Sequence, residues 1–153
     1  MIGNKEDLLG YCGLYCGDCA GFSGEIAKAS LNLKHFIDKY KLNITAKELF
    51  DGKLKDFDKF YEMLQFMIAL KCPQICRERE TPVEGCEIKQ CCRQKNYFAC
   101  YECNDFSNCK KLKSLEALHG DSCVKNLKAI KERGLSNWIE HDKRLWFGTE
   151  IDD

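Results

Sequence analysis

The sequence has little proline, no net charge and no long apolar run. Its 153 residues include two prolines, and 24 Lys and Arg balance 24 Asp and Glu. No stretch approaches the roughly 18 apolar residues of a membrane span, and the N-terminal residues lack the apolar core of a signal peptide. A zero formal charge gives no overall field that would draw the protein onto nucleic acid or an anionic membrane. We therefore expect a cytoplasmic protein without a membrane partner.

Motifs of common enzymes are also missing. The sequence contains no HExxH, no GxSxG, no phosphate-binding glycine loop and no recognisable pair of catalytic carboxylates. These absences disfavour an enzyme. A zinc ion with an open coordination position, or a reactive thiol at Cys92 or Cys123, stays open as an alternative that needs none of these motifs.

Most of the chain has helical periodicity. Residues 25–41 and 57–72 each place apolar side chains three and four residues apart, and the second pattern stops before Pro73. We interpret the Met and Phe stripe of the second helix as core. The sequence from Thr45 to Glu48 has the form of a capping box.

Further helical patterns follow, and they end at two glycines, Gly120 and Gly134. Ser136 is a candidate cap for the last helix. No alternating strand pattern is visible. The sequence therefore predicts one mainly α domain over 1–153, small and helical, with an irregular metal-binding segment at 72–109.

That segment contains eight of the twelve cysteines and few other apolar side chains. Such a stretch cannot offset its ordering entropy by burial alone, so it needs cross-links. In a reducing compartment, thiols in close groups bind metal more often than they form disulfides. A separate group of three cysteines, at 12–19, forms an N-terminal cysteine hook.

Pairs of cysteines with two to four residues between them can direct two thiolates at one ion, and two pairs complete a tetrahedral zinc site. We expect two zinc ions, with an iron–sulfur cluster as the alternative. Which groups share a metal stays open. The predicted metal ligands are Cys12, Cys16, Cys19, Cys72, Cys76, Cys86, Cys91, Cys100, Cys103 and Cys109.

Two cysteines, Cys92 and Cys123, are left out of the predicted ligand set as spares. Cys91 and Cys92 point in different directions on a helix, so one of them is expected to ligate and the other to pack. Cys123 stands alone at the start of a helix, where burial is the expected role. Lys89 is placed to offset thiolate charge, although a solvated basic face explains it equally well.

The hook, "YCGLYCGDCAGF", has the CxxxCxxC spacing of radical-SAM enzymes. Such an enzyme needs a large partial α/β barrel, whereas this chain is short and helical in pattern. Asp18 also stands where an aromatic residue commonly precedes the third cysteine. We therefore interpret the hook as structural.

The hook, together with "GCEIKQC", "CYECNDFSNC" and "LKAIKERGLSNW", resembles a cysteine-rich bacterial and archaeal family, domain of unknown function 3795. The resemblance implies zinc binding but no reaction. It carries over the predicted ligands except Cys72 and Cys76, which have three residues between them where the family tends to have two. Cys92 and Cys123 are additions of this chain.

We therefore expect a zinc-binding protein of unknown biochemical role, whose structural metal supports a surface for a protein partner. The alternative is an iron–sulfur redox or sensor protein. Nucleic acid is a disfavoured partner, because residues 109–144 contain nine Lys and Arg against five Asp and Glu, a modest excess mixed at helical intervals.

Overall fold

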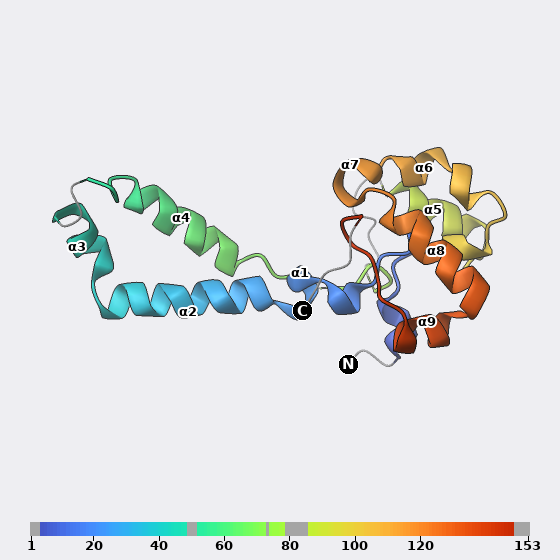
Figure 1. Ribbon diagram of the computed structural model, residues 1–153, viewed down its shortest axis with the longest axis horizontal. Coiled ribbons are helices and arrows are strands. Elements are labelled where there is room, and N and C mark those ends of the chain that lie inside the picture. Colours follow the sequence, from blue (N-terminus) through green and yellow to red (C-terminus); the bar gives the residue numbers. More distant parts are fainter. Residues whose placement is uncertain (1–3, 49–51, 73, 79–85, 149–153) are drawn as a thin grey trace. The chain divides into compact units, whose positions relative to one another are not determined.

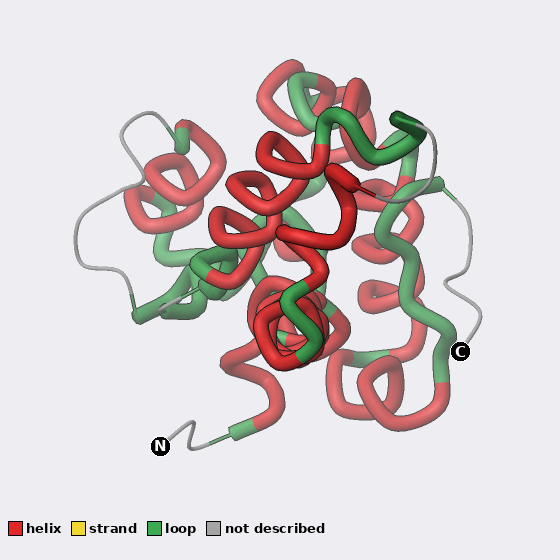
Figure 2. Tube along the Cα trace, turned by 90° about the vertical axis from the view of Figure 1, so that its left-hand side faces the viewer, coloured by secondary structure: helices red, strands yellow, loops and turns green. Residues whose placement is uncertain are grey.

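A computed structural model describes residues 4–48, 52–72, 74–78 and 86–148. Helices joined by turns make up this part of the chain (Figures 1 and 2), and within it no residues form a named strand. One isolated antiparallel bridge pairs Leu9 with Tyr15. The predicted mainly α class is therefore confirmed. None of the helices in these ranges is both long enough and apolar enough to cross a membrane.

The chain divides into two compact units. Unit 1 comprises Met1–Asp18 and Gln74–Asp153, and unit 2 comprises Cys19–Pro73. The single domain expected from the sequence stays a prediction.

Unit 2 is a helical hairpin. It contains α1 (Ala20–Ser23), α2 (Glu25–Lys39), α3 (Leu42–Glu48) and α4 (Phe57–Ile68). Helices α2 and α4 lie side by side and run in opposite directions (Figure 1). The buried core of the hairpin is small and consists of Ile37, Ala46, Phe57 and Leu64.

Two expectations for unit 2 are wrong. Thr45 is inside α3 rather than at its start, and its hydroxyl donates to the carbonyl of Leu42, so no helix begins with a capping box there. The Met and Phe stripe of α4 is only partly core. Phe57 is buried, whereas Phe60 is 43% exposed and Met67 is 37% exposed.

Unit 1 packs short helices around two apolar clusters. Its elements are η1 (Lys5–Leu8), η2 (Cys16–Asp18), α5 (Glu87–Gln94), η3 (Cys100–Glu102), η4 (Phe106–Asn108), α6 (Lys110–Lys113), α7 (Glu116–His119), α8 (Ser122–Arg133) and α9 (Leu135–His141). The described residues of the segment expected to be irregular thus include a helix of two turns, α5, and the short η3 and η4. One cluster centres on Trp138, which is fully buried, and the other contains most of the cysteines.

The predicted helix ends in unit 1 are confirmed in part. Gly120 and Gly134 follow the last residues of α7 and α8. Ser136, however, lies within α9, and its hydroxyl donates to the carboxylate of Glu6 instead of capping the helix. Gly134 takes the capping position because its φ of 83° suits glycine.

Candidate functional site

Eight cysteines of unit 1 belong to a single apolar cluster, which we call the cysteine core. They come from the N-terminal turn, from the residues around α5, η3 and α6, and from α8, so widely separated parts of the chain meet there. Tyr11, Leu14, Ile88, Leu112 and Leu127 are among the buried residues that surround them. The eight cysteines are Cys12, Cys76, Cys86, Cys92, Cys100, Cys103, Cys109 and Cys123.

The turn at Gly10–Leu14 positions Cys12. The Gly10 N–H donates to the Leu14 carbonyl at 2.8 Å, which closes the turn. Gly13 has a φ of +93°, and a Cβ atom there would lie 2.7 Å from Cγ of Leu127. Only glycine combines this backbone angle with such a close approach to α8, so the turn lies directly on that helix.

Asn126 fixes the same turn from the other side. Its side chain is 2% exposed and donates to the carbonyls of Gly13, at 3.0 Å, and Leu145, at 2.9 Å. Its amide oxygen accepts from the Leu145 N–H at 3.1 Å. One buried amide thus ties the N-terminal turn and the C-terminal segment to α8.

This docking brings Cys12 beside Cys123, near the start of α8. The two thiols share a hydrogen bond, which raises the pKa of Cys12 and lowers the pKa of Cys123. Burial adds to the increase at Cys12.

Cys92 and Cys100 form a second pair, with their Sγ atoms 3.5 Å apart. Both are buried, and their hydrogen bond raises the pKa of Cys100 and lowers the pKa of Cys92. The Cys100 N–H donates to the Tyr11 carbonyl at 3.0 Å, so the backbone next to Cys12 is bonded to this second pair. The sulfur of Cys12 is also near enough to raise the pKa of Cys100.

Two cations lie against the cysteine core. Lys89 is 3% exposed and donates from Nζ to the carbonyl of Cys76 at 2.8 Å. Arg77 lies between the rings of Tyr11 and Phe98, at 4.8 and 3.7 Å from their centroids. Burial raises the pKa of the Cys76 thiol, and the charge of Lys89 opposes that increase. A solvated basic face is therefore the wrong interpretation of Lys89.

The structure brings together six of the predicted ligands in the cysteine core, namely Cys12, Cys76, Cys86, Cys100, Cys103 and Cys109. Of the twelve cysteines, all of which lie in the described ranges, four are outside this core: Cys16, Cys19, Cys72 and Cys91. In unit 2 the Cys72 N–H donates to the Gly21 carbonyl at 2.8 Å, which places Cys72 near the start of α1.

Sequence reasoning treated Cys92 and Cys123 as spares, yet both are in the cysteine core and each is paired with a predicted ligand. The burial expected for Cys123 is confirmed, at 2% exposure. The available signal was helical spacing. Cys92 follows Ile88 by four residues, and Cys123 precedes Leu127 by four, so each shares the apolar face of its helix.

The cysteine core supplies sulfurs in pairs. All twelve cysteines are free thiols. In the ranges that the structure describes, no three side chains of Cys, His, Asp or Glu are grouped closely enough to hold a metal ion. Zn–S bonds of about 2.3 Å in a tetrahedron put neighbouring sulfurs about 3.8 Å apart. The 3.5 Å between Cys92 and Cys100 is close to that separation, so this pair fits two positions of such a site.

Comparison with known proteins gives one match. A family model described as protein of unknown function (DUF3795) matches residues 8–114. These residues include every cysteine except Cys123, whereas the motif at 127–138 lies beyond them. No curated protein and no solved structure matches the chain.

Proposed function

The chain belongs to the DUF3795 family, whose function is unknown, and we propose that it is a zinc-binding protein whose metal is held by thiolates of the cysteine core. One observation carries the proposal: two close thiol pairs, Cys12 with Cys123 and Cys92 with Cys100, lie in one buried cluster. Each pair supplies two of the four sulfurs that a structural zinc site uses.

Packing alone is a weak explanation for these pairs. Free cysteine is often buried as a small hydrophobe, but an apolar role does not require thiols to meet sulfur to sulfur. Zinc binding releases the protons of the thiols that become ligands, and it replaces each thiol–thiol hydrogen bond with two metal–sulfur bonds. The remaining members of the cysteine core, Cys76, Cys86, Cys103 and Cys109, are the candidates for a second ion.

The two cations that lie against the cysteine core support the same proposal. A zinc ion with four thiolates has a net charge of −2, and burying that charge is costly unless positive groups lie nearby. Lys89 and Arg77 are in place against the cysteine core, where they would reduce this cost.

A zinc ion in this core would have a structural role. It would link the N-terminal turn, the residues around α5 and η3, and α8. Metal binding in such small domains contributes directly to the free energy of folding. The rigid surface that results is suited to binding a protein partner, which is the biochemical role we infer.

Elemental analysis of the purified full-length chain tests the proposal. We expect a colourless protein with one or two zinc ions, and a chelator that removes them should lower the melting temperature, with recovery when zinc is restored. A brown protein with broad visible absorption would replace zinc with an iron–sulfur cluster. A melting curve that is unchanged after complete zinc removal would contradict the structural role.

A further inference from the structure

Unit 2 exposes an unusual number of large apolar side chains. Of the thirteen that are exposed in the described ranges, eleven belong to this hairpin and two to unit 1. The hairpin's own core contains four buried apolar residues. So small a core is a weak basis for ordering some 50 residues.

Eight of these eleven residues follow heptad spacing on the two long helices, at intervals of three and four along α2 and along α4 with its C-terminal extension. This is the a/d pattern of a helix-bundle seam. The α2 stripe is Ile26, Ala29, Leu33, Phe36 and Tyr40, and the α4 stripe is Phe60, Met63, Met67 and Leu70. The other three, Leu31, Ile44 and Phe66, lie off these stripes.

The two stripes lie on the same side of the hairpin. Leu33 and Phe36 precede the buried Ile37 by four and one residues. Phe60 and Met63 precede the buried Leu64 by the same intervals. Each residue is rotated by about 100° around the helix axis from the one before it. Each stripe is therefore displaced in the same direction around its own helix from the buried residue, Ile37 or Leu64, of that helix. Because α2 and α4 are antiparallel, equal rotations point to the same side (Figure 1).

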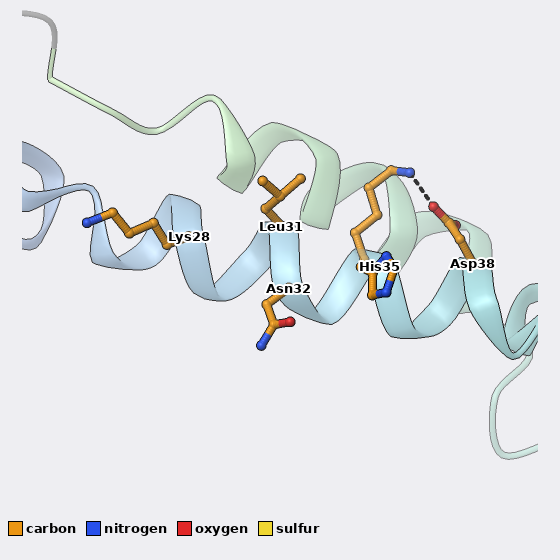
Figure 3. A pocket seen from close by; sticks show the side chains of 6 residues that line it. Lys28, Leu31, Asn32, His35 and Asp38 are labelled. Atoms are coloured by element: carbon orange, nitrogen blue, oxygen red, sulfur yellow. Dashed lines mark hydrogen bonds and ion pairs between the residues drawn. The ribbon is translucent and has the colours of Figure 1, made fainter.

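The opposite side of the hairpin is polar. Lys34 forms an ion pair with Asp38 at 2.6 Å, and the Tyr61 hydroxyl donates to the same carboxylate at 2.5 Å. An open groove lies along this part of α2, lined by Lys28, Leu31, Asn32, Lys34, His35 and Asp38 (Figure 3). None of the nine residues of the two stripes is charged. The hairpin therefore has one charge-free apolar face and one charged face.

We propose that this apolar face binds a second copy of the chain, so that two hairpins form a four-helix bundle. Its eight large side chains are between 37% and 66% exposed. Side chains of this size present on the order of 700 Å² of apolar surface at such exposure. A stable interface buries about 800 Å² on each partner. The area is therefore close to what a stable dimer needs.

A second copy fits this face better than an unrelated partner does. A two-fold axis through the face would match each heptad stripe with a stripe of the same spacing, which is the self-complementarity of a C₂ interface. Two antiparallel hairpins packed in this way reproduce the core of a four-helix bundle. The proposal goes beyond zinc binding and uses no residue of the cysteine core, so either can fail without the other.

Sedimentation equilibrium on the full-length, metal-replete protein tests the proposal. We expect a dimer, and Leu33→Glu should raise its dissociation constant at least about 100-fold, because the carboxylate would be buried without a partner. Leu31→Glu is the matched control. Leu31 is on the same helix and 56% exposed, but it lies along the polar groove, so this variant should remain dimeric.

Met63→Glu repeats the test on α4, and circular dichroism checks that each variant keeps its helices. A monomeric wild-type protein would overturn the proposal, as would equal dissociation constants for the Leu33 and Leu31 variants. Vesicles of phosphatidylcholine and phosphatidylglycerol provide a last test. Binding of a monomer to them that Leu33→Glu abolishes would assign the face to lipid and would likewise overturn the dimer.

Discussion

The sulfur atoms of Cys92 and Cys100 are 3.5 Å apart in the interior of unit 1, whereas Cys91, the immediate neighbour of Cys92, is outside the cysteine core. Cys91 has the spacing expected of a ligand, because it follows Cys86 with four residues between them. Cys92, however, is the one that lies in the cysteine core. The difference arises because α5 turns its apolar face, with Ile88 and Cys92, toward the core.

This relationship leads to a direct test of which cysteine binds metal. Cys92→Ala should reduce zinc affinity at least about 100-fold, since removing a ligand should cost more than removing an outer-shell partner. Cys91→Ala should leave it unchanged. Competition with a chromophoric chelator measures the affinity, and the thiolate-to-cobalt absorption of the Co²⁺ form reports the number of sulfur ligands. The reverse order of the two variants would restore the ligand set expected from the sequence.

Gly13 is the residue through which the N-terminal turn reaches α8. Gly13→Ala should destabilise the protein by roughly 2–4 kcal/mol, because a Cβ at positive φ is strained and would also overlap Leu127. Denaturant unfolding measures the loss. In a Leu127→Ala background the same change should cost at least about 1 kcal/mol less, since the overlapping side chain is gone. Equal costs in both backgrounds would show that the contact is unimportant.

The sequence predicted the local features of the fold well. Helix α2 and the glycines after α7 and α8 were expected from apolar spacing and helix-end signals, which depend on neighbouring residues. The caps predicted at Thr45 and Ser136 are wrong, because such a motif is compatible with either the start or the interior of a helix. Tertiary contacts decide between them: Ser136 is drawn to Glu6, a residue far away in the sequence.

The cysteine core was predictable only in part. Spacing identified close groups of thiols, and six predicted ligands do share one cluster. Spacing could not show that Cys12 meets Cys123, because that contact depends on the docking of a turn onto a helix more than a hundred residues away. For the same reason Asn126, which holds that turn, carries no recognisable signal in the sequence.

Asn126 should contribute more to stability than any exposed polar residue of α8. Asn126→Ala removes the three hydrogen bonds of a buried side chain and leaves the carbonyls of Gly13 and Leu145 without this donor, which should cost roughly 2–4 kcal/mol. Lys125→Ala is the control on the same helix. This variant loses only an exposed ion pair with Asp121, which contributes about 0.5 kcal/mol or less to the free energy of unfolding. Denaturant midpoints that shift equally would contradict the role of Asn126.

Asp38 gives unit 2 a defined response to pH. The Lys34 ammonium and the Tyr61 hydroxyl both donate to its carboxylate and hold the pKa of Asp38 below its ordinary value near 3.8. A lowered pKa stabilises the fold above the unfolded value, and that stabilisation disappears as the pH falls through the folded pKa. At the other limit, Asp38 raises the pKa of Lys34 to about 12, so the contribution of the lysine is lost only as the pH rises from about 10.5 toward that value.

The Asp38 response can be measured one residue at a time. A carboxyl ¹³C titration by NMR from about pH 2 to pH 6 should place the Asp38 midpoint below that of an unperturbed aspartate. Tyr61→Phe should raise this midpoint, because one of the two donors is lost. Tyr40→Phe should leave it unchanged, since Tyr40 belongs to the apolar stripe on the other side of the hairpin. If both tyrosine variants shift the midpoint equally, the hydrogen bond from Tyr61 is not its cause.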